Sequence, residues 1–320
     1  MMKFKLNTGF LLCIFIIGGC TVPTNKSSNQ INQKIDSQNP FYTESTLYMK
    51  YPQFDIIKNE HYAPAFEKGM TNHMAEIDAI AERADSPTLE NTKIAMEKSG
   101  ALLDRVATVF FALISANTND EMEKIRSEMA PKLSAHSDQI LLNGKLFHRV
   151  KTIYEQRDQL GLDAESKRLV EKYYTDFIRS GANLSNEEKE SLKKINGEMA
   201  VLQTTFSQNV LKEVNALAVV VDFKNELDGL SDAAIEAAAN EAKSRELDGK
   251  YVLTLRNTSG QPPIASLTNR ALRERIHKTS LSRGSRGGDY DNRDVLANII
   301  KLRAERAQLM GHDNHAAYSL

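Results

Sequence analysis

The sequence predicts a mainly α-helical protein with one small β element, and three observations support this class. Apolar side chains recur at steps of three and four residues along most of the chain after residue 59. Short β-branched runs occur near 217–222 and 251–255, and a helical pattern separates them. Hydrophobic residues make up 41% of the 320 residues, which is enough for a sizeable core in one large or two ordinary domains.

The first twenty residues have the pattern of an export signal that ends in a lipidation site. Lys3 and Lys5 precede an uncharged apolar run at 9–17 that is too short to span a bilayer. The string Ile-Gly-Gly-Cys then ends at Cys20, as in a bacterial lipobox. We predict cleavage between Gly19 and Cys20, lipid on the Cys20 thiol, and an exported, membrane-anchored protein on the periplasmic side in a Gram-negative cell. The alternative is an ordinary signal peptide or uncleaved anchor with an incidental cysteine.

Four regions are predicted along the chain. They are a signal peptide at 1–19, the lipidated cysteine with a flexible tether at 20–38, a helical domain at 39–256 and a further region at 257–320. The tether is rich in Ser, Asn, Gln and Thr, so it cannot support a packed core. The formal net charge of −1 gives no electrostatic drive toward DNA or RNA, and no nucleic-acid partner is predicted.

The ordered part is predicted to begin near residue 39 and to consist of successive helices. Apolar spacing predicts helices over 59–83, 88–117, 118–140, 146–160, 164–180, 185–216 and 231–246. Thr118 is expected to cap the third of these, with Glu121 reaching back, and Ser185 with Glu188 forms a capping box at the start of the longest. The β-branched runs are expected to form a small sheet beside the last helix.

The longest predicted helix carries a narrow apolar seam. Its members alternate steps of three and four: Leu192, Ile195, Met199, Leu202 and Phe206. We interpret the seam as a packing surface inside the chain's own helical bundle. The alternative is a coiled-coil surface for a partner helix.

No complete catalytic or metal site is predicted from the residues. The zinc-peptidase string His-Glu-x-x-His is absent, and the nearest pattern, His312 and His315, has a spacing of three without a visible third ligand. We interpret that pair as part of a solvated turn. The Gly- and Arg-rich run at 283–288 is interpreted as a flexible loop, with phosphate binding the less favoured alternative. His136, on an apolar helix, is interpreted as structural.

Several strings in order resemble the N-terminal part of the thimet oligopeptidase family of zinc metallopeptidases, in its peptidyl-dipeptidase branch. The resemblance covers essentially the whole chain after the tether. The strings are Asn39-Pro40-Phe41, Phe54-Asp55, His61 to Phe66, Leu89-Glu90-Asn91-Thr92, Ser99-Gly100 through Phe111, Ala130 to His136, Leu255 to Thr258, Asp291-Asn292, Leu302 to Ala307, Gly311 and Ala317 to Leu320.

The resemblance implies the multi-helix N-terminal half of a neurolysin-like zinc oligopeptidase fold, with the small β element near 217–256. It makes 39–256 the N-terminal peptidase domain and 257–320 the start of the catalytic domain, ending before the zinc motif. The complete enzyme would hold one zinc ion and remove C-terminal dipeptides from short oligopeptides in a channel. For this chain the resemblance supplies no catalytic residue, no metal ligand and no bound cofactor, and we predict inactivity alone. The alternative is a lipid-anchored peptide-binding or scaffold protein without catalysis.

Overall fold

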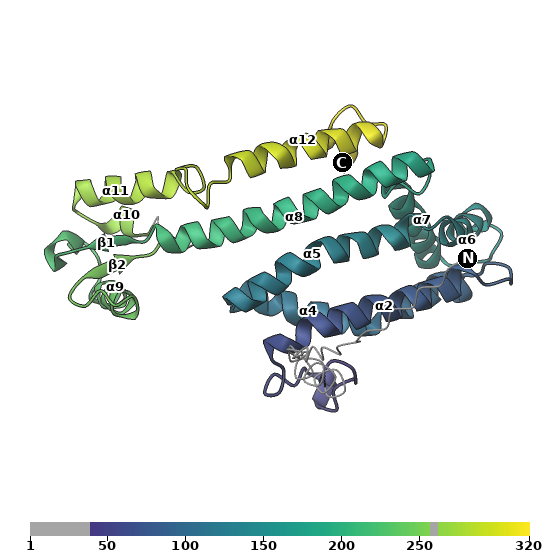
Figure 1. Ribbon diagram of the computed structural model, residues 1–320, viewed down its shortest axis with the longest axis horizontal. Helices are drawn as coiled ribbons and strands as arrows, with labels where there is room; N and C mark the ends of the chain where they lie inside the picture. Colours follow the sequence, from purple (N-terminus) through teal and green to yellow (C-terminus); the bar gives the residue numbers. More distant parts are fainter. Residues whose placement is uncertain (1–38, 257–261) are drawn as a thin grey trace, which may run out of the picture.

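The computed structural model describes residues 39–256 and 262–320, which form a succession of helices and a two-stranded sheet (Figure 1). The predicted mainly α class with a small β element is therefore confirmed. The predicted cleavage at Gly19 and lipidation of Cys20 lie outside the described residues. The helices are α2 (Tyr62–Ala81), α3 (Ala95–Lys98), α4 (Ala101–Ala116), α5 (Asp120–Leu141), α6 (Gly144–Gln156), α7 (Ala164–Arg179), α8 (Asn186–Ala216), α9 (Asp232–Ser244), α10 (Pro262–Ser266), α11 (Arg270–Leu281), α12 (Arg293–Leu309) and α13 (His315–Ser319). The strands are β1 (Val219–Val221) and β2 (Tyr251–Leu253), and short turns of helix occur at Tyr48–Lys50, Asn59–His61, Leu89–Ile94 and Lys224–Leu227.

Side-chain caps fix where the helices begin. At α8 the predicted capping box is confirmed, because Ser185 Oγ accepts from the Glu188 amide at 3.3 Å and the Glu188 carboxylate accepts from the Ser185 amide at 2.8 Å. At α5 the predicted Thr118 cap is wrong. Asn119 Oδ1 accepts from the Met122 amide at 3.0 Å, while the Thr118 hydroxyl is engaged by the carboxylate of Glu123.

The helix predicted over 88–117 is interrupted. It begins with a π-helical turn at Leu89–Ile94 and breaks at Ser99–Gly100, where Gly100 has a φ of 76°, in the left-handed region. The stretch Leu89–Ala116 is long and apolar enough to cross a membrane by length and composition. In the structure, however, Val106 and Phe110 of α4 are fully buried and pack against α2 as part of a core. We therefore interpret this stretch as part of the helical core.

Three apolar cores divide the described residues. The first joins α2, α4 and the start of α5, where the rings of Phe66 and Phe110 meet edge to face at 5.3 Å between centroids. The second lies where the end of α2 meets α6 and α7, around Leu146 and Phe177. The third encloses the sheet.

The third core lies around β1 and β2, which pair antiparallel with Val219 opposite Leu253. It also buries Leu267 and Ile276, so residues on both sides of the predicted boundary between 256 and 257 share this core. Strand β1 buries the alternate residues Val219 and Val221 and contacts α11, whereas β2 buries the consecutive residues Val252 and Leu253 and contacts α9. This unit forms one end of the molecule in Figure 1.

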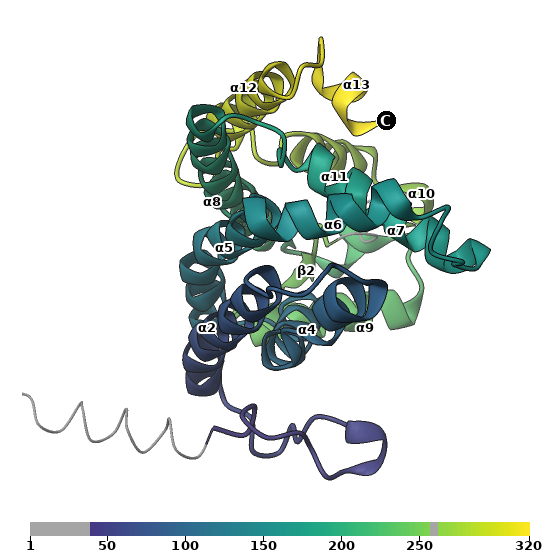
Figure 2. The same cartoon turned by 90° about the vertical axis from the view of Figure 1, so that its right-hand side faces the viewer.

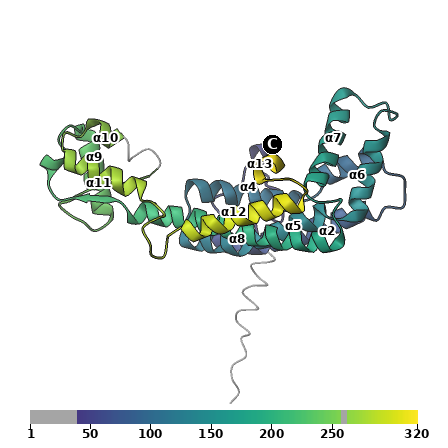
Figure 3. The ribbon, with the colours of Figure 1, turned by 90° about the horizontal axis from the view of Figure 1, so that it is seen from above.

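The helix α8, 31 residues long, connects this β unit to the helical cores. It packs along α5 on one side and along α12, which runs back antiparallel, on the other (Figure 1). Figure 2 shows these helices side by side in the order α12, α8, α5 and α2, with α13 at the α12 edge and α4 at the α2 edge. Seen from above, the α6–α7 pair and the β unit project on the same side of α8 (Figure 3).

Candidate functional site

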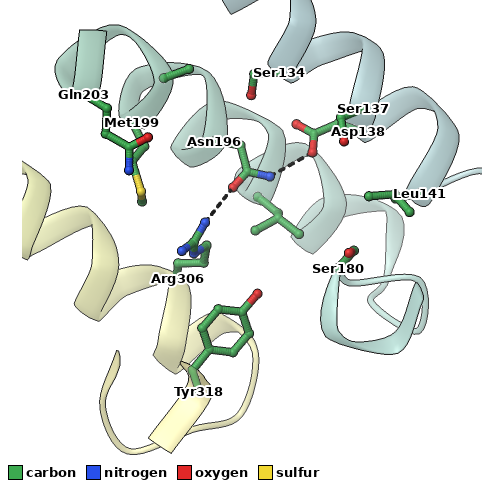
Figure 4. Close-up of a pocket in the computed structure, with 12 residues that line it drawn as sticks. Ser134, Ser137, Asp138, Leu141, Ser180, Asn196, Met199, Gln203, Arg306 and Tyr318 are labelled. Atoms are coloured by element: carbon green, nitrogen blue, oxygen red, sulfur yellow. Dashed lines mark hydrogen bonds between the residues drawn. The ribbon is translucent and has the colours of Figure 1, made fainter. Parts of the chain in front are cut away.

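The candidate site is a polar pocket of about 370 Å³ where α5, α8 and α12 meet beside α13. Figure 4 shows its side chains converging from these four helices and from the turn after α7. Because helices far apart in the sequence supply its walls, no continuous sequence motif encodes it. The polar residues that line it include Ser134 and Asp138 of α5, Asn196 and Gln203 of α8, Arg306 of α12 and Tyr318 of α13.

Three of these side chains form a line across the pocket. The Asn196 amide donates to Asp138 Oδ1 at 2.8 Å, and Arg306 Nη1 lies 3.5 Å from Asn196 Oδ1, at the limit of a hydrogen bond. One neutral amide thus separates a carboxylate from a guanidinium (Figure 4). The orientation of the amide follows from charge, since its NH₂ faces the acid and its oxygen faces the base.

Asp138 and Arg306 each have one polar atom without a hydrogen-bond partner among the described residues. Asp138 is 7% exposed, and burial raises the pKa of its carboxyl above the ordinary range, against the opposing effects of Asn196, Lys193 and Arg306. Asp138 Oδ2 and Arg306 Nε are buried and have no hydrogen-bond partner among the residues described. Buried polar atoms are usually paired, so two unpaired atoms beside one pocket set it apart from the rest of the fold.

Tyr318 holds the open side of the pocket in place. Its hydroxyl donates to the backbone carbonyl of Arg179 at 2.8 Å, which ties α13 to the end of α7. The guanidinium carbon of Arg306 lies 5.3 Å from the centroid of the Tyr318 ring, within the range of a cation–π contact. The position of Arg306 therefore depends on both Asn196 and Tyr318.

A second polar cluster lies between α2 and α5, away from the pocket. The Ser99 hydroxyl donates to the Met96 carbonyl at 2.6 Å, so it accepts from His73 Nε2 at 3.1 Å. His73 Nδ1 then accepts from His136 Nε2 at 3.0 Å, which makes the His73 ring neutral. Burial lowers the pKa of each histidine, in agreement with this proton count. The structural interpretation of His136 is confirmed by these contacts.

The remaining histidine candidates line neither cluster, although both lie near Tyr318 of the pocket. His315 is the first residue of α13, and the His312 ring packs edge-on against Tyr318 at 5.5 Å between centroids. Within residues 39–256 and 262–320, no three His, Cys, Asp or Glu side chains are grouped so that they could hold a metal ion. The two histidines therefore do not assemble a zinc site with any third described ligand.

The run at 283–288 lies in a loop, as predicted, and two of its arginines contact other parts of the chain. Arg286 Nε pairs with the Glu213 carboxylate at 2.9 Å, and Glu213 is only 5% exposed. Arg283 Nη1 donates to the Leu255 carbonyl at 3.1 Å. The backbone N–H of Asn292 closes the loop by donating to the carbonyl of Gly284 at 2.8 Å. These contacts join the end of α8 to the start of α12 and use the charge that a phosphate would need.

The seam on α8 packs inside the chain. Leu192 and Met199 are 2% and 3% exposed, and α8 lies against α5 and α12. The interpretation as a bundle seam is therefore confirmed for these two residues, while Ile195, Leu202 and Phe206 are half-buried. Asn196 stands four residues after Leu192 and three before Met199, so it occupies a core position of this seam. A polar residue at such a position was the one sequence signal that could have indicated the pocket.

Comparison with known proteins places this geometry in a family context. Dipeptidyl carboxypeptidase of Escherichia coli (strain K12) is 39% identical over 284 residues, which cover 89% of this chain and 42% of that protein. The Salmonella typhimurium protein of the same name matches equally over 284 residues. Oligopeptidase A of Salmonella typhimurium is 28% identical over 286 residues, covering 88% of this chain and 41% of that protein.

The extent of these matches limits what they describe. No family profile matches the chain. The chain spans about two fifths of the length of the curated relatives it matches. The match nevertheless extends over almost the whole folded part, and the helical architecture agrees with it. The chain is homologous to dipeptidyl carboxypeptidase and to oligopeptidase A, and it corresponds to the N-terminal part of the thimet oligopeptidase family.

Proposed function

We propose that this chain is the N-terminal, substrate-channel part of an exported zinc peptidyl-dipeptidase, which removes dipeptides from the C-termini of oligopeptides. The observation that carries the proposal is the 39% identity over 284 residues to a protein named for dipeptide release from carboxyl ends. The oligopeptidase A relatives support oligopeptides as the substrate class. The projection of the α6–α7 pair and the β unit on one side of α8 suits a wall beside an extended peptide (Figure 3).

The described residues do not fit the zinc ion that such an enzyme uses. His312 is packed against Tyr318, and no third ligand stands beside His312 and His315 in the described ranges. A catalytic zinc needs three protein ligands and an open position. We therefore assign no catalytic step to this chain and propose that it binds and confines the peptide.

A chimera tests the proposed activity. The 284 matching residues of this chain would replace their counterparts in the Escherichia coli dipeptidyl carboxypeptidase, and a short peptide with a free C-terminus would be the substrate. We expect zinc-dependent release of dipeptides, loss of release with a chelator, and no release by the 320-residue chain alone. The Escherichia coli protein without this segment is the control. A folded chimera that releases single amino acids or nothing would contradict the proposal, as would zinc-dependent cleavage by the chain alone.

Export and anchoring are tested separately at the two cysteines. Expressed in a Gram-negative cell with a labelled fatty acid, the chain should carry label and sediment with membranes. Cys20→Ser should abolish both, because the thiol is the attachment point. Cys13→Ser removes a cysteine of the same predicted signal region and should leave both unchanged. Equal labelling of the Cys20→Ser protein would refute lipidation at Cys20.

A further inference from the structure

The pocket between α5, α8 and α12 contains one negative and one positive residue, and each has an atom without a partner. Asp138 Oδ2 can accept a hydrogen bond and Arg306 Nε can donate one, yet neither does so among the described residues. The other residues that line the pocket are neutral. The formal charges of the pocket therefore balance. Asp138 Oδ2 still needs a hydrogen-bond donor, and Arg306 Nε still needs an acceptor.

The two charged groups do not satisfy one another because Asn196 stands between them. The contacts of 2.8 Å and 3.5 Å, joined through a planar amide, place Asp138 Oδ1 and Arg306 Nη1 at most about 9 Å apart. This span suits a molecule that carries its own positive and negative groups close together.

We propose that this pocket binds a small zwitterion, an α-amino acid or a dipeptide, with its ammonium at Asp138 and its carboxylate at Arg306. The volume of about 370 Å³ lies within the usual size of small-molecule sites. Ser134 and Gln203 offer neutral hydrogen bonds beside the two charges. A simple anion would leave Asp138 facing a like charge, and a simple cation would do the same at Arg306.

The contact between Arg306 and Tyr318 supports the assignment of the carboxylate end. A guanidinium held at a ring face keeps its donors in a fixed plane, which favours recognition of a carboxylate over a single oxygen atom. At the other end, an ammonium would donate to the oxygen of Asp138 that Asn196 leaves unpaired. Each end of the ligand thus meets a different unsatisfied atom.

The first test uses the 320-residue chain and a series of ligands, with binding followed by calorimetry. Alanine and dialanine should bind, whereas N-acetylalanine, which lacks the ammonium, and alanine amide, which lacks the carboxylate, should bind at least tenfold more weakly. Preference for alanine over dialanine would identify a free amino acid, and the reverse preference would identify a dipeptide. Equal binding of the blocked compounds, or no binding of either zwitterion at millimolar concentration, would overturn the proposal.

The second test uses charge-matched variants. Asp138→Asn and Arg306→Gln should each weaken alanine binding at least tenfold. Their controls remove the same charge from an exposed place on the same helix, Glu128→Gln on α5 and Lys301→Gln on α12, and should bind alanine as the parent chain does. Tight binding by both pocket variants would refute the assignment. The ligand series on the parent chain remains decisive if a pocket variant fails to fold. No outcome depends on peptidase activity, so this proposal and the proposed function can fail separately.

Discussion

The guanidinium of Arg149 offers a direct test of how the segment before α3 is held to α6. Arg149 is 4% exposed, and its donors reach the carbonyls of Arg83 and Asp85, each at 3.0 Å, the Thr92 hydroxyl at 3.2 Å and the Asn91 amide oxygen at 2.9 Å. Replacing it by methionine keeps much of the volume and removes every donor. Four acceptors then lose the Arg149 donor, although Asn91 Oδ1 still accepts from the Thr88 amide and the Thr92 hydroxyl.

The magnitude follows from the chemistry of these contacts. A hydrogen bond from a charged donor contributes about 1.5–3 kcal/mol, and each buried acceptor that is left without a donor costs about 1–3 kcal/mol. We expect Arg149→Met to lower the free energy of unfolding by about 4 kcal/mol. The carboxylate of Asp85 lies 3.8 Å from Arg149, but its side chain is 50% exposed, so its charge contributes little.

Urea unfolding followed by circular dichroism measures this loss. Arg168→Met is the matched control, because the Arg168 side chain is 80% exposed, and we expect a change within about 0.5 kcal/mol. Asp85→Asn should cost under about 1 kcal/mol. The reasoning is refuted if Arg149→Met is as stable as Arg168→Met. It is also refuted if Asp85→Asn is as damaging as Arg149→Met, since the ion pair would then be the main contribution.

Three further predictions concern the backbone, the buried histidines and a helix cap. Gly100→Ala should lower the free energy of unfolding by about 2 kcal/mol, because the φ of Gly100 is 76° and the new Cβ would lie 2.9 Å from His73. Gly197→Ala in α8 should raise the free energy of unfolding by up to about 1 kcal/mol, because nothing lies within 4 Å of its new Cβ. The midpoints of urea unfolding compare the two variants. The pKa values of His73 and His136 are lowered in the folded state, so the unfolded chain binds more protons and stability should fall as the pH drops below 6.5 and through the lowered folded values. His136→Gln should reduce that slope, measured as the free energy of unfolding against pH, and an unchanged slope would contradict the proton count. Ser185→Ala should cost about 1 kcal/mol by the same urea assay, and an unchanged midpoint would show that the capping box contributes nothing.

Local sequence signals predicted the longer helices up to α9, because each depends on neighbours in the chain, but α10 to α13 were not predicted. Ser185 and the apolar seam after it identified the longest helix and its buried face. The error at the start of α5 was also local. Thr118 and Asn119 are both good caps, and only the path of the backbone decides between them. The break at Gly100 depends on the ring of His73, which is 27 residues earlier and packs where a side chain would stand.

The pocket could not be predicted in the same way. Asp138 and Asn196 are 58 residues apart, and Arg306 is 110 residues beyond Asn196. Each is an ordinary polar residue within a helix, and only the packing of α5, α8 and α12 brings them together. Sequence spacing along one helix carries no information on this arrangement. The resemblance strings included Arg306 and Tyr318 without indicating what either contacts.

The length of α8 has a mechanical consequence. Its 31 residues extend over about 46 Å as a single helix, with the α6–α7 pair near one end and the β unit at the other (Figures 1 and 3). A bend of about 10° near the start of α8 would displace the far end of the helix by about 8 Å. The stiffness of α8, reinforced by α12 alongside it, therefore sets how far apart the two projecting ends stand.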